Sequence, residues 1–205
     1  MLEIHFDNVS QVFVGREVLR QLSISFYGGM VTAVAGANGS GKSTLLRLAA
    51  RLILPTSGTI ETLYDGAEVR GQEYRAMLGM ATPEMELYTR LTVRENLAFL
   101  LSVRGVPYEE AHLADLLTRV GLPTEVLNRK TGQLSTGMRQ RVRLAVLLGV
   151  DAEAWLLDEP GLALDEHGRA LLLNETRAAA KRGRLILWAT NDREEREAAD
   201  VCVSL

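Results

Sequence analysis

The stretch from Gly36 to Thr44 reads Gly-Ala-Asn-Gly-Ser-Gly-Lys-Ser-Thr, and it constrains the fold of this chain most strongly. It fits the pattern G-x-x-x-x-G-K-[ST], with a strand-like apolar run before it and a helix-like run after it. Glycine at 36, 39 and 41 lets the backbone take positive φ angles, so successive N–H groups can converge on an anion. The helix that follows adds the positive end of its dipole. The stretch predicts a loop that cradles a polyphosphate, and a glycine-rich turn without a ligand is the weaker alternative.

Each side chain of this loop has an expected role. We expect Lys42 to reach the β- and γ-phosphates as a point charge, Ser43 to ligate Mg²⁺, and Thr44 to meet the α-phosphate. Phe13 lies in a turn-rich stretch between two expected strands, where it could stack on an adenine ring or simply pack. The candidate nucleotide-binding residues of the loop are Gly36, Ala37, Asn38, Gly39, Ser40, Gly41, Lys42, Ser43 and Thr44.

Two acidic residues follow another apolar run. Residues 154–157 predict a buried strand, and Asp158 and Glu159 stand at its carboxyl end, where ligands bind in α/β proteins. We expect Asp158 to hold Mg²⁺ through its water shell and Glu159 to polarise an attacking water as a general base. An isolated acidic strand end is usually only solvated. The phosphate loop upstream favours the catalytic interpretation.

The remaining patterns predict how the chain is organised. Alternating apolar residues in 2–7 and 22–26 predict antiparallel strands. Residues 85–150 are mainly helical, and Thr92 with Glu95 predicts a capping box at the start of one helix. Ser135 is expected as the N-cap of a helix that ends at Gly149, and Ser135 with Gly137 gives a second, weaker anion-site signal. Strands that alternate with helices imply an α/β fold with a parallel core sheet.

Composition excludes several classes of function. At 205 residues the chain suits one domain or a closely packed pair of subdomains. A net charge of −3 gives no electrostatic footprint for nucleic acid. The single cysteine, Cys202, excludes an internal disulfide, and we expect it to be a small buried residue of a terminal strand. We also expect no signal peptide and no membrane-spanning segment.

Taken together, these residues resemble the ATP-binding cassette (ABC) ATPase family over essentially the whole chain. Gly36–Ser43 is similar to its Walker A motif and Leu156–Glu159 to its Walker B motif. Leu134–Gln140 is similar to its signature sequence, with Thr136 and Met138 in place of Gly and Gln, and Leu162–Asp165 to its D-loop. Phe13 falls at the position of the adenine-stacking aromatic. The resemblance implies a P-loop NTPase fold with an N-terminal antiparallel β subdomain and a helical insert of about 85–150, all within one domain, 1–205.

The resemblance also implies a mechanism that needs two chains. Family members hold two ATP molecules, with Mg²⁺, at a dimer interface between the Walker A motif of one chain and the signature helix of the other. Ser135 and Gly137 would therefore act in trans, in a homodimer, and Glu159 would direct water onto the γ-phosphate.

Two positions depart from the family pattern. Pro83 stands where members have a Gln that contacts Mg²⁺ and water, so either Glu84 substitutes for it or the contact is lost. Asn191 replaces the usual switch His; it can donate a hydrogen bond to the γ-phosphate but cannot become cationic. We expect intact ATP binding with slow basal hydrolysis.

The first functional hypothesis is the ATPase subunit of a membrane transporter, peripheral on the cytoplasmic face of the cell membrane. Met85 to Arg94 would line the groove that docks its integral membrane subunits. In size and layout the chain is most similar to the haem-exporter ATPase of cytochrome c maturation, with ABC-2 type polysaccharide or drug exporters close behind. The alternatives are a soluble ABC ATPase in assembly and a regulatory ATP-binding module. The transported substrate, the direction and the identity of the second chain stay open.

Overall fold

The computed structural model describes all residues from Met1 to Leu205. They form two compact units, one of Met1–Met80, Ala152–Glu159 and Thr176–Leu205, and one of Ala81–Asp151 and Pro160–Glu175. The first unit contains two β-sheets and the phosphate loop, whereas the second is mainly helical. Each unit is built around its own set of buried apolar side chains.

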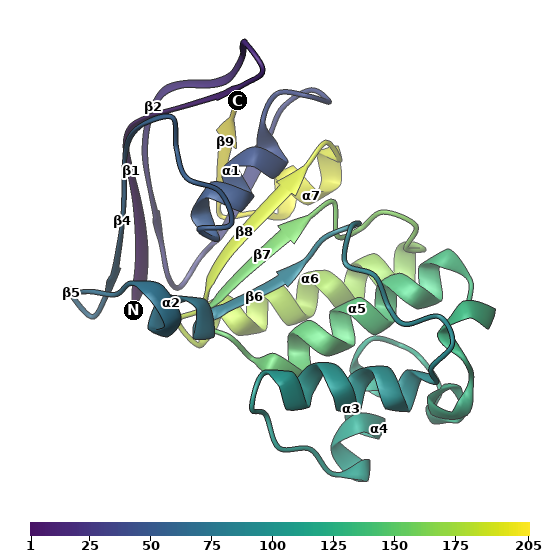
Figure 1. Cartoon of the computed structure of the whole chain (residues 1–205). Helices are drawn as coiled ribbons and strands as arrows, with labels where there is room; N and C mark the ends of the chain where they lie inside the picture. Colours follow the sequence, from purple (N-terminus) through teal and green to yellow (C-terminus); the bar gives the residue numbers. More distant parts are fainter. The chain divides into compact units, whose positions relative to one another are not determined.

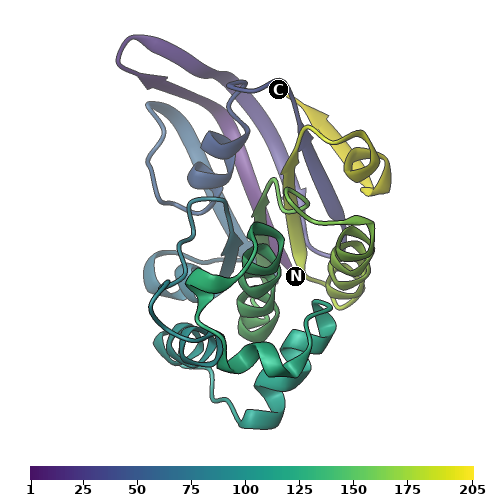
Figure 2. The same ribbon diagram turned by 90° about the vertical axis from the view of Figure 1, so that its right-hand side faces the viewer.

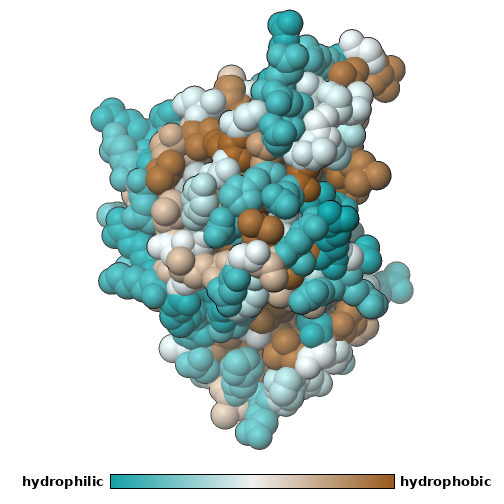
Figure 3. Space-filling model, turned by 90° about the vertical axis from the view of Figure 1, so that its left-hand side faces the viewer, coloured by the Kyte–Doolittle hydropathy of each residue, from teal (hydrophilic) through white to brown (hydrophobic).

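An antiparallel sheet begins the first unit (Figure 1). Its strands stand in the order β2-β1-β4-β5, with β1 at Leu2–Phe13, β2 at Arg16–Tyr27, β4 at Ser57–Tyr64 and β5 at Ala67–Glu68. The buried side chains Leu2, Ile4 and Phe6 alternate along β1, and the rings of Phe6 and Phe26 meet edge to face at 5.8 Å. The predicted antiparallel strands are therefore confirmed. Figure 3 shows hydrophilic and hydrophobic side chains interspersed on the face of the molecule that lies at the left of Figure 1.

The second sheet of this unit is parallel. Its strand order is β6-β7-β8-β3-β9, with β6 at Leu78–Ala81, β7 at Ala154–Asp158, β8 at Leu185–Thr190, β3 at Val31–Ala35 and β9 at Val201–Ser204. Every residue of β3 and β8 is buried, as expected for a parallel sheet covered on both faces. Cys202 lies on the edge strand β9 and is exposed, so the expectation that it is buried was wrong. Strand β9 pairs with β3 alone, so its side chains have fewer neighbours than those of the central strands.

Helices of the first unit pack on this sheet. Helix α1, Lys42–Ala49, contacts β7 and β8, and α7, Arg193–Ala198, contacts β3. Figure 1 and Figure 2 show α1 and α7 on opposite faces of the sheet. The short helix α2, Gly71–Ala76, buries Tyr74, whose hydroxyl donates to the carbonyl of Ala49 at the end of α1. Burial raises the pKa of the Tyr74 hydroxyl.

The second unit is built from α3, Val93–Val103, α4, Glu110–Arg119, and α5, Thr136–Val150, which contact one another. The predicted capping box is present, because Thr92 accepts from the backbone N–H of Glu95 and Glu95 accepts from that of Thr92. Helix α5 ends at Val150, one residue beyond the expected Gly149, with Asp151 in a left-handed conformation. Two 3₁₀ turns, Thr124–Asn128 and Thr131–Gln133, connect α4 to α5, and α6 runs from Glu166 to Lys181. None of the helices is both long and apolar enough to cross a bilayer.

Candidate functional site

The phosphate loop connects the buried strand β3 to helix α1, as the sequence predicted. Gly41 is the N-cap of α1 and has a φ of 106°, in the region that favours glycine. A Cβ at Gly41 would lie 2.9 Å from Cδ2 of Leu19 and 3.2 Å from the carbonyl oxygen of Val18. Glycine at position 41 therefore permits both the positive φ angle and the close approach of β2 to the loop.

The ammonium group of Lys42 lies inside this loop. The residue is only 6 % exposed, and Nζ donates to the carbonyls of Gly36 at 2.8 Å and Ala37 at 3.2 Å. Its third donor contacts Oδ1 of Asn191 at 2.8 Å. An ammonium has three donors, so each has an acceptor here. These contacts fix a positive charge next to the N–H groups of the loop.

Asn191 follows strand β8 and bridges two residues of the loop. Its Oδ1 accepts from Lys42, and its Nδ2 donates to Oδ1 of Asn38. The contact of Asn191 with Asn38 was not predictable from the sequence pattern, since these residues are far apart in the sequence. The amide thus positions the lysine, and its predicted hydrogen bond to the γ-phosphate stays a prediction.

The acidic pair lies at the carboxyl end of β7. Asp158 is the last residue of the strand, and Glu159 has a left-handed φ of 46°, which is uncommon for a side chain other than glycine. The backbone N–H of Glu159 donates to the carbonyl of Ala189 on β8 at 2.9 Å. Both acids are half-buried. Strands β7, β8 and β3 are parallel, so their carboxyl ends lie at the same edge of the sheet (Figure 1). The acids, Asn191 and the phosphate loop stand at these strand ends.

The residues present fit a site in which Mg²⁺ is bound jointly by protein side chains, water and the phosphates of a nucleotide. The chain has no group of three or more His, Cys, Asp or Glu side chains that could hold a metal by itself. Mg²⁺ is typically bound by one or two carboxylates, waters and substrate phosphates. The hydroxyl of Ser43, in the first turn of α1, and the carboxylate of Asp158 are donors of that kind. The hydroxyl of Ser40 is buried without a hydrogen-bond partner, which leaves a further polar atom for a ligand in the loop.

Phe13 ends strand β1 at the tip of the β1–β2 hairpin. It is 42 % exposed, and Arg16 stands opposite it in the strand register. The ring is not part of the hydrophobic core, so the packing alternative loses its support. Its stacking on an adenine ring stays a prediction.

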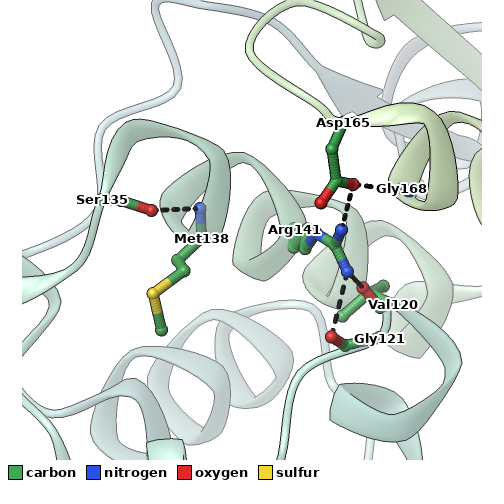
Figure 4. Close-up of polar contacts among 7 residues, drawn as sticks. All are labelled: Val120, Gly121, Ser135, Met138, Arg141, Asp165 and Gly168. Atoms are coloured by element: carbon green, nitrogen blue, oxygen red, sulfur yellow. Dashed lines mark hydrogen bonds and ion pairs between the residues drawn. The ribbon is translucent and has the colours of Figure 1, made fainter.

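The signature residues belong to the second unit, at the start of helix α5. Ser135 is the N-cap, as predicted, and its Oγ accepts from the backbone N–H of Met138 at 3.2 Å (Figure 4). A Cβ at Gly137 would lie 2.6 Å from the carbonyl oxygen of Ala163. Glycine at 137 therefore allows the D-loop, which contains Ala163, to approach the first turn of α5.

Arg141 connects helix α5 to two other segments of this unit (Figure 4). Its Nη1 donates to the carbonyls of Val120 at 3.0 Å and Gly121 at 2.9 Å, and its Nη2 contacts the carboxylate of Asp165. Asp165 also accepts from the backbone N–H of Gly168 in α6 at 2.8 Å. This backbone hydrogen bond, and then the charge of Arg141, hold the pKa of Asp165 below its usual value. The D-loop was predicted from the sequence, whereas Arg141 was not; its position as a charged residue among the apolar positions of α5 was a usable signal.

The segment expected to dock membrane subunits, Met85 to Arg94, lines a hollow of about 600 Å³. The carbonyl of Met85, at one end of the segment, accepts from Nε of Arg143 on α5 at 2.6 Å. Pro83 and Glu84 are exposed in the turn after β6. The lining residues are Glu86, Leu87, Tyr88, Thr89, Arg90 and Leu91.

Known proteins are similar to this chain in sequence and in fold. The family model described as ABC transporter matches residues 19–161. The sulfate/thiosulfate import ATP-binding protein CysA of Thermosynechococcus vestitus is 38 % identical over 209 residues, which cover 98 % of this chain and 60 % of CysA. The cytochrome c biogenesis ATP-binding export protein CcmA of Bradyrhizobium diazoefficiens is 40 % identical over 177 residues, 86 % of each protein. The chain thus spans three fifths of the importer protein and most of the exporter protein.

Solved structures agree with this match. A dimeric bacterial ABC transporter cassette superposes with a TM-score of 0.86 at 25 % identity, covering 98 % of this chain and 94 % of the cassette. An ATP-binding subunit of an ABC transporter superposes with a TM-score of 0.87 at 25 % identity, covering 98 % of this chain and 85 % of that subunit. The likeness therefore extends over both compact units.

Proposed function

The chain belongs to the ABC transporter family as one of its ATP-binding domains, and from this premise we propose that it hydrolyses ATP to drive transport through separate membrane subunits. The family and the fold class expected from the sequence are thereby confirmed. The observation that carries the proposal is the arrangement at one edge of the parallel sheet, where Lys42, Asn191 and the acids Asp158 and Glu159 follow neighbouring strands. We further propose that residues 1–205 form one ABC ATPase domain with a helical subdomain of about 85–150.

Each residue of this edge has a chemical task. The phosphate loop, from Gly36 to Thr44, binds the triphosphate through its N–H groups, and Lys42 supplies a fixed positive charge. Ser43, and Asp158 through the water shell, would hold Mg²⁺, which would neutralise charge on the phosphate oxygens. Glu159 holds and orients the attacking water and accepts its proton. The left-handed backbone at Glu159, tied to Ala189, fixes the direction in which the side chain leaves the strand.

A second copy of the chain completes the site in this proposal. Helix α5 has 15 residues, and Ser135 at its N-cap is exposed. A helix start with an exposed hydroxyl and N–H groups suits the γ-phosphate of an ATP held by another chain. The dimeric cassette to which this chain is similar supports this arrangement. Ser135 and Gly137 would thus act in trans within a homodimer.

We place the domain at the cytoplasmic face of a membrane, with integral subunits docked at the hollow lined by Glu86 to Leu91. Names of the relatives support transport, since CysA is described as an import and CcmA as an export ATP-binding protein. Export, with haem for cytochrome c maturation as the specific cargo, is supported by the 40 % identity to CcmA over 86 % of both proteins. Three alternatives remain. Import is supported by the 38 % identity to CysA, and the other two are an ABC-2 type exporter and an assembly ATPase.

The test combines chemistry with capture of the partner. ATP hydrolysis by the purified chain is compared with that of Glu159→Gln, which we expect to slow turnover by about 10²–10⁴-fold because the general base is lost. Glu166→Gln, on an exposed acid in the first turn of α6, is the control and should leave turnover unchanged. Glu159→Gln should also form dimers in the presence of ATP and Mg²⁺, as measured by light scattering. Equal turnover of all three proteins would contradict the proposal.

A tagged chain is then purified from detergent-solubilised membranes of the native host, and co-purifying proteins are identified by mass spectrometry. Stoichiometric multi-span membrane proteins are the expected result, and their identity separates haem export from other cargo. Recovery of soluble partners alone would overturn the transporter assignment in favour of an assembly or regulatory ATPase.

A further inference from the structure

A second positive charge, that of Arg16, lies at the phosphate loop and is not part of the loop motif. Arg16 is the first residue of β2, directly after the turn at Val14 and Gly15. Its Nη2 is 3.5 Å from the carbonyl oxygen of Gly39, at the outer limit of a hydrogen bond. The β1–β2 hairpin therefore brings a guanidinium to the middle of the loop from outside the Walker A sequence.

The charge of Arg16 is available to a ligand. The carboxylate of its neighbour Glu17 is 3.9 Å from Arg20, and no carboxylate of the chain pairs with Arg16. A guanidinium has five N–H donors in a planar fork that suits phosphate oxygens, and here only one of them has a contact. Lys42, in contrast, is buried and has an acceptor for each of its donors. Arg16 is thus an exposed cation beside the loop.

The hairpin also places Arg16 next to the expected base-stacking residue. Phe13 and Arg16 are directly opposite each other in the antiparallel register of β1 and β2. Directly opposite residues on antiparallel strands lie about 4.5–5.5 Å apart at Cβ and share a face of the sheet. One hairpin end therefore presents an aromatic ring and a cation to the same ligand.

We propose that Arg16 is a nucleotide-binding residue that contacts the phosphate oxygens of ATP. This inference rests on the proposed ATP-binding function and adds a specificity to it. Phe13 stacks on any purine face, whereas Arg16 favours ligands with a phosphate chain over nucleosides. Because Arg16 is exposed, its contribution decreases with salt.

The test measures the binding of ATP, ADP and adenosine to the full chain by calorimetry, in low and in high salt. We expect Arg16→Gln to weaken ATP binding about three- to ten-fold, the size of one partly exposed charge-assisted hydrogen bond, and to leave adenosine binding unchanged. The loss should shrink in 0.5 M salt, and Arg16→Lys should recover part of the affinity. Arg20→Gln, on the same strand and paired with Glu17, is the control with expected wild-type affinity.

The outcomes separate this inference from the proposed function. If the wild-type chain binds none of the three ligands, the proposed function fails and the inference fails with it. If the wild-type chain binds ATP and Arg16→Gln binds it equally well, the proposed function stands and the inference is overturned. An equal loss for ATP and adenosine would also overturn the inference, because it would indicate a distorted hairpin and not a phosphate contact.

Discussion

Replacing Arg141 by methionine tests how the second unit is held together. The side chain is only 10 % exposed, and its guanidinium serves three acceptors, the carbonyls of Val120 and Gly121 and the carboxylate of Asp165. A hydrogen bond to a charged group contributes about 1.5–3 kcal/mol, and a buried acceptor left without a partner adds a desolvation cost. Methionine keeps part of the apolar packing. We therefore expect Arg141→Met to lower the free energy of unfolding by about 3 kcal/mol.

The assay is urea unfolding followed by circular dichroism, with thermal unfolding as a second measure. A loss of about 3 kcal/mol should lower Tm by about 6–12 °C in a chain of this size. Arg141→Lys should be intermediate, because an ammonium keeps the charge but lacks the planar fork. Arg20→Met, whose side chain is 81 % exposed, is the control and should stay within about 0.5 kcal/mol of wild type.

The ion pair with Asp165 adds a pH dependence whose sign follows from the structure. The pKa of Asp165 is lowered, first by the N–H of Gly168 and then by Arg141, so the folded state favours the carboxylate. This stabilisation is fully present above the ordinary pKa of 3.8 and is lost as the pH falls through the folded-state pKa. Asp165→Asn should thus be less stable than wild type at pH 6, and the difference should disappear as the pH falls through the folded-state pKa. A loss below 1 kcal/mol for Arg141→Met, with a native spectrum, would refute the role assigned to its buried hydrogen bonds.

Four further predictions concern single positions. Asn191→His should raise the turnover measured by steady-state phosphate release, because a histidine can bind the γ-phosphate as a cation; an unchanged rate would show that Asn191 does not limit hydrolysis. Gly137→Ala should lower both Tm and ATP turnover, since its Cβ would meet the carbonyl of Ala163 at 2.6 Å, and wild-type values for both would contradict this. Thr92→Ala should cost about 1 kcal/mol in urea unfolding through loss of the helix cap. The hydrogen bonds from Thr92 lower the pKa of Glu95 below its ordinary 4.5, so Glu95→Gln should be less stable than wild type at pH 7 and converge with it as the pH falls through the folded-state pKa.

Local patterns were sufficient to predict most elements of this fold. The alternation of Leu2, Ile4 and Phe6 and the capping box of Thr92 are read from residues at most four positions apart, and both are present in the structure. The phosphate loop was predictable for the same reason, because its strand, glycines and helix are contiguous in sequence.

Contacts between distant segments were not predictable in this way. Arg141 finds its carbonyl acceptors about twenty residues upstream, and Asn191 contacts Asn38 from the opposite end of the chain. No periodicity encodes such partners. Cys202 shows the related limit, because an apolar residue in a strand is buried only if the neighbouring elements cover it, and β9 is an edge strand.

The proposed mechanism takes its site residues from two copies of the chain, one supplying the phosphate loop and the other the start of α5. The first unit supplies the phosphate loop, with Lys42 fixed by three acceptors and Arg16 exposed beside Gly39. The second unit supplies a helix start at Ser135 whose first turn contains no acidic residue. The oxygens of the γ-phosphate are negatively charged on the side that contacts the loop and on the opposite side. A γ-phosphate neutralised by the loop on one side therefore still favours a positive partner on the other. The start of α5 from another chain has this character, and its arrival would then depend on ATP itself.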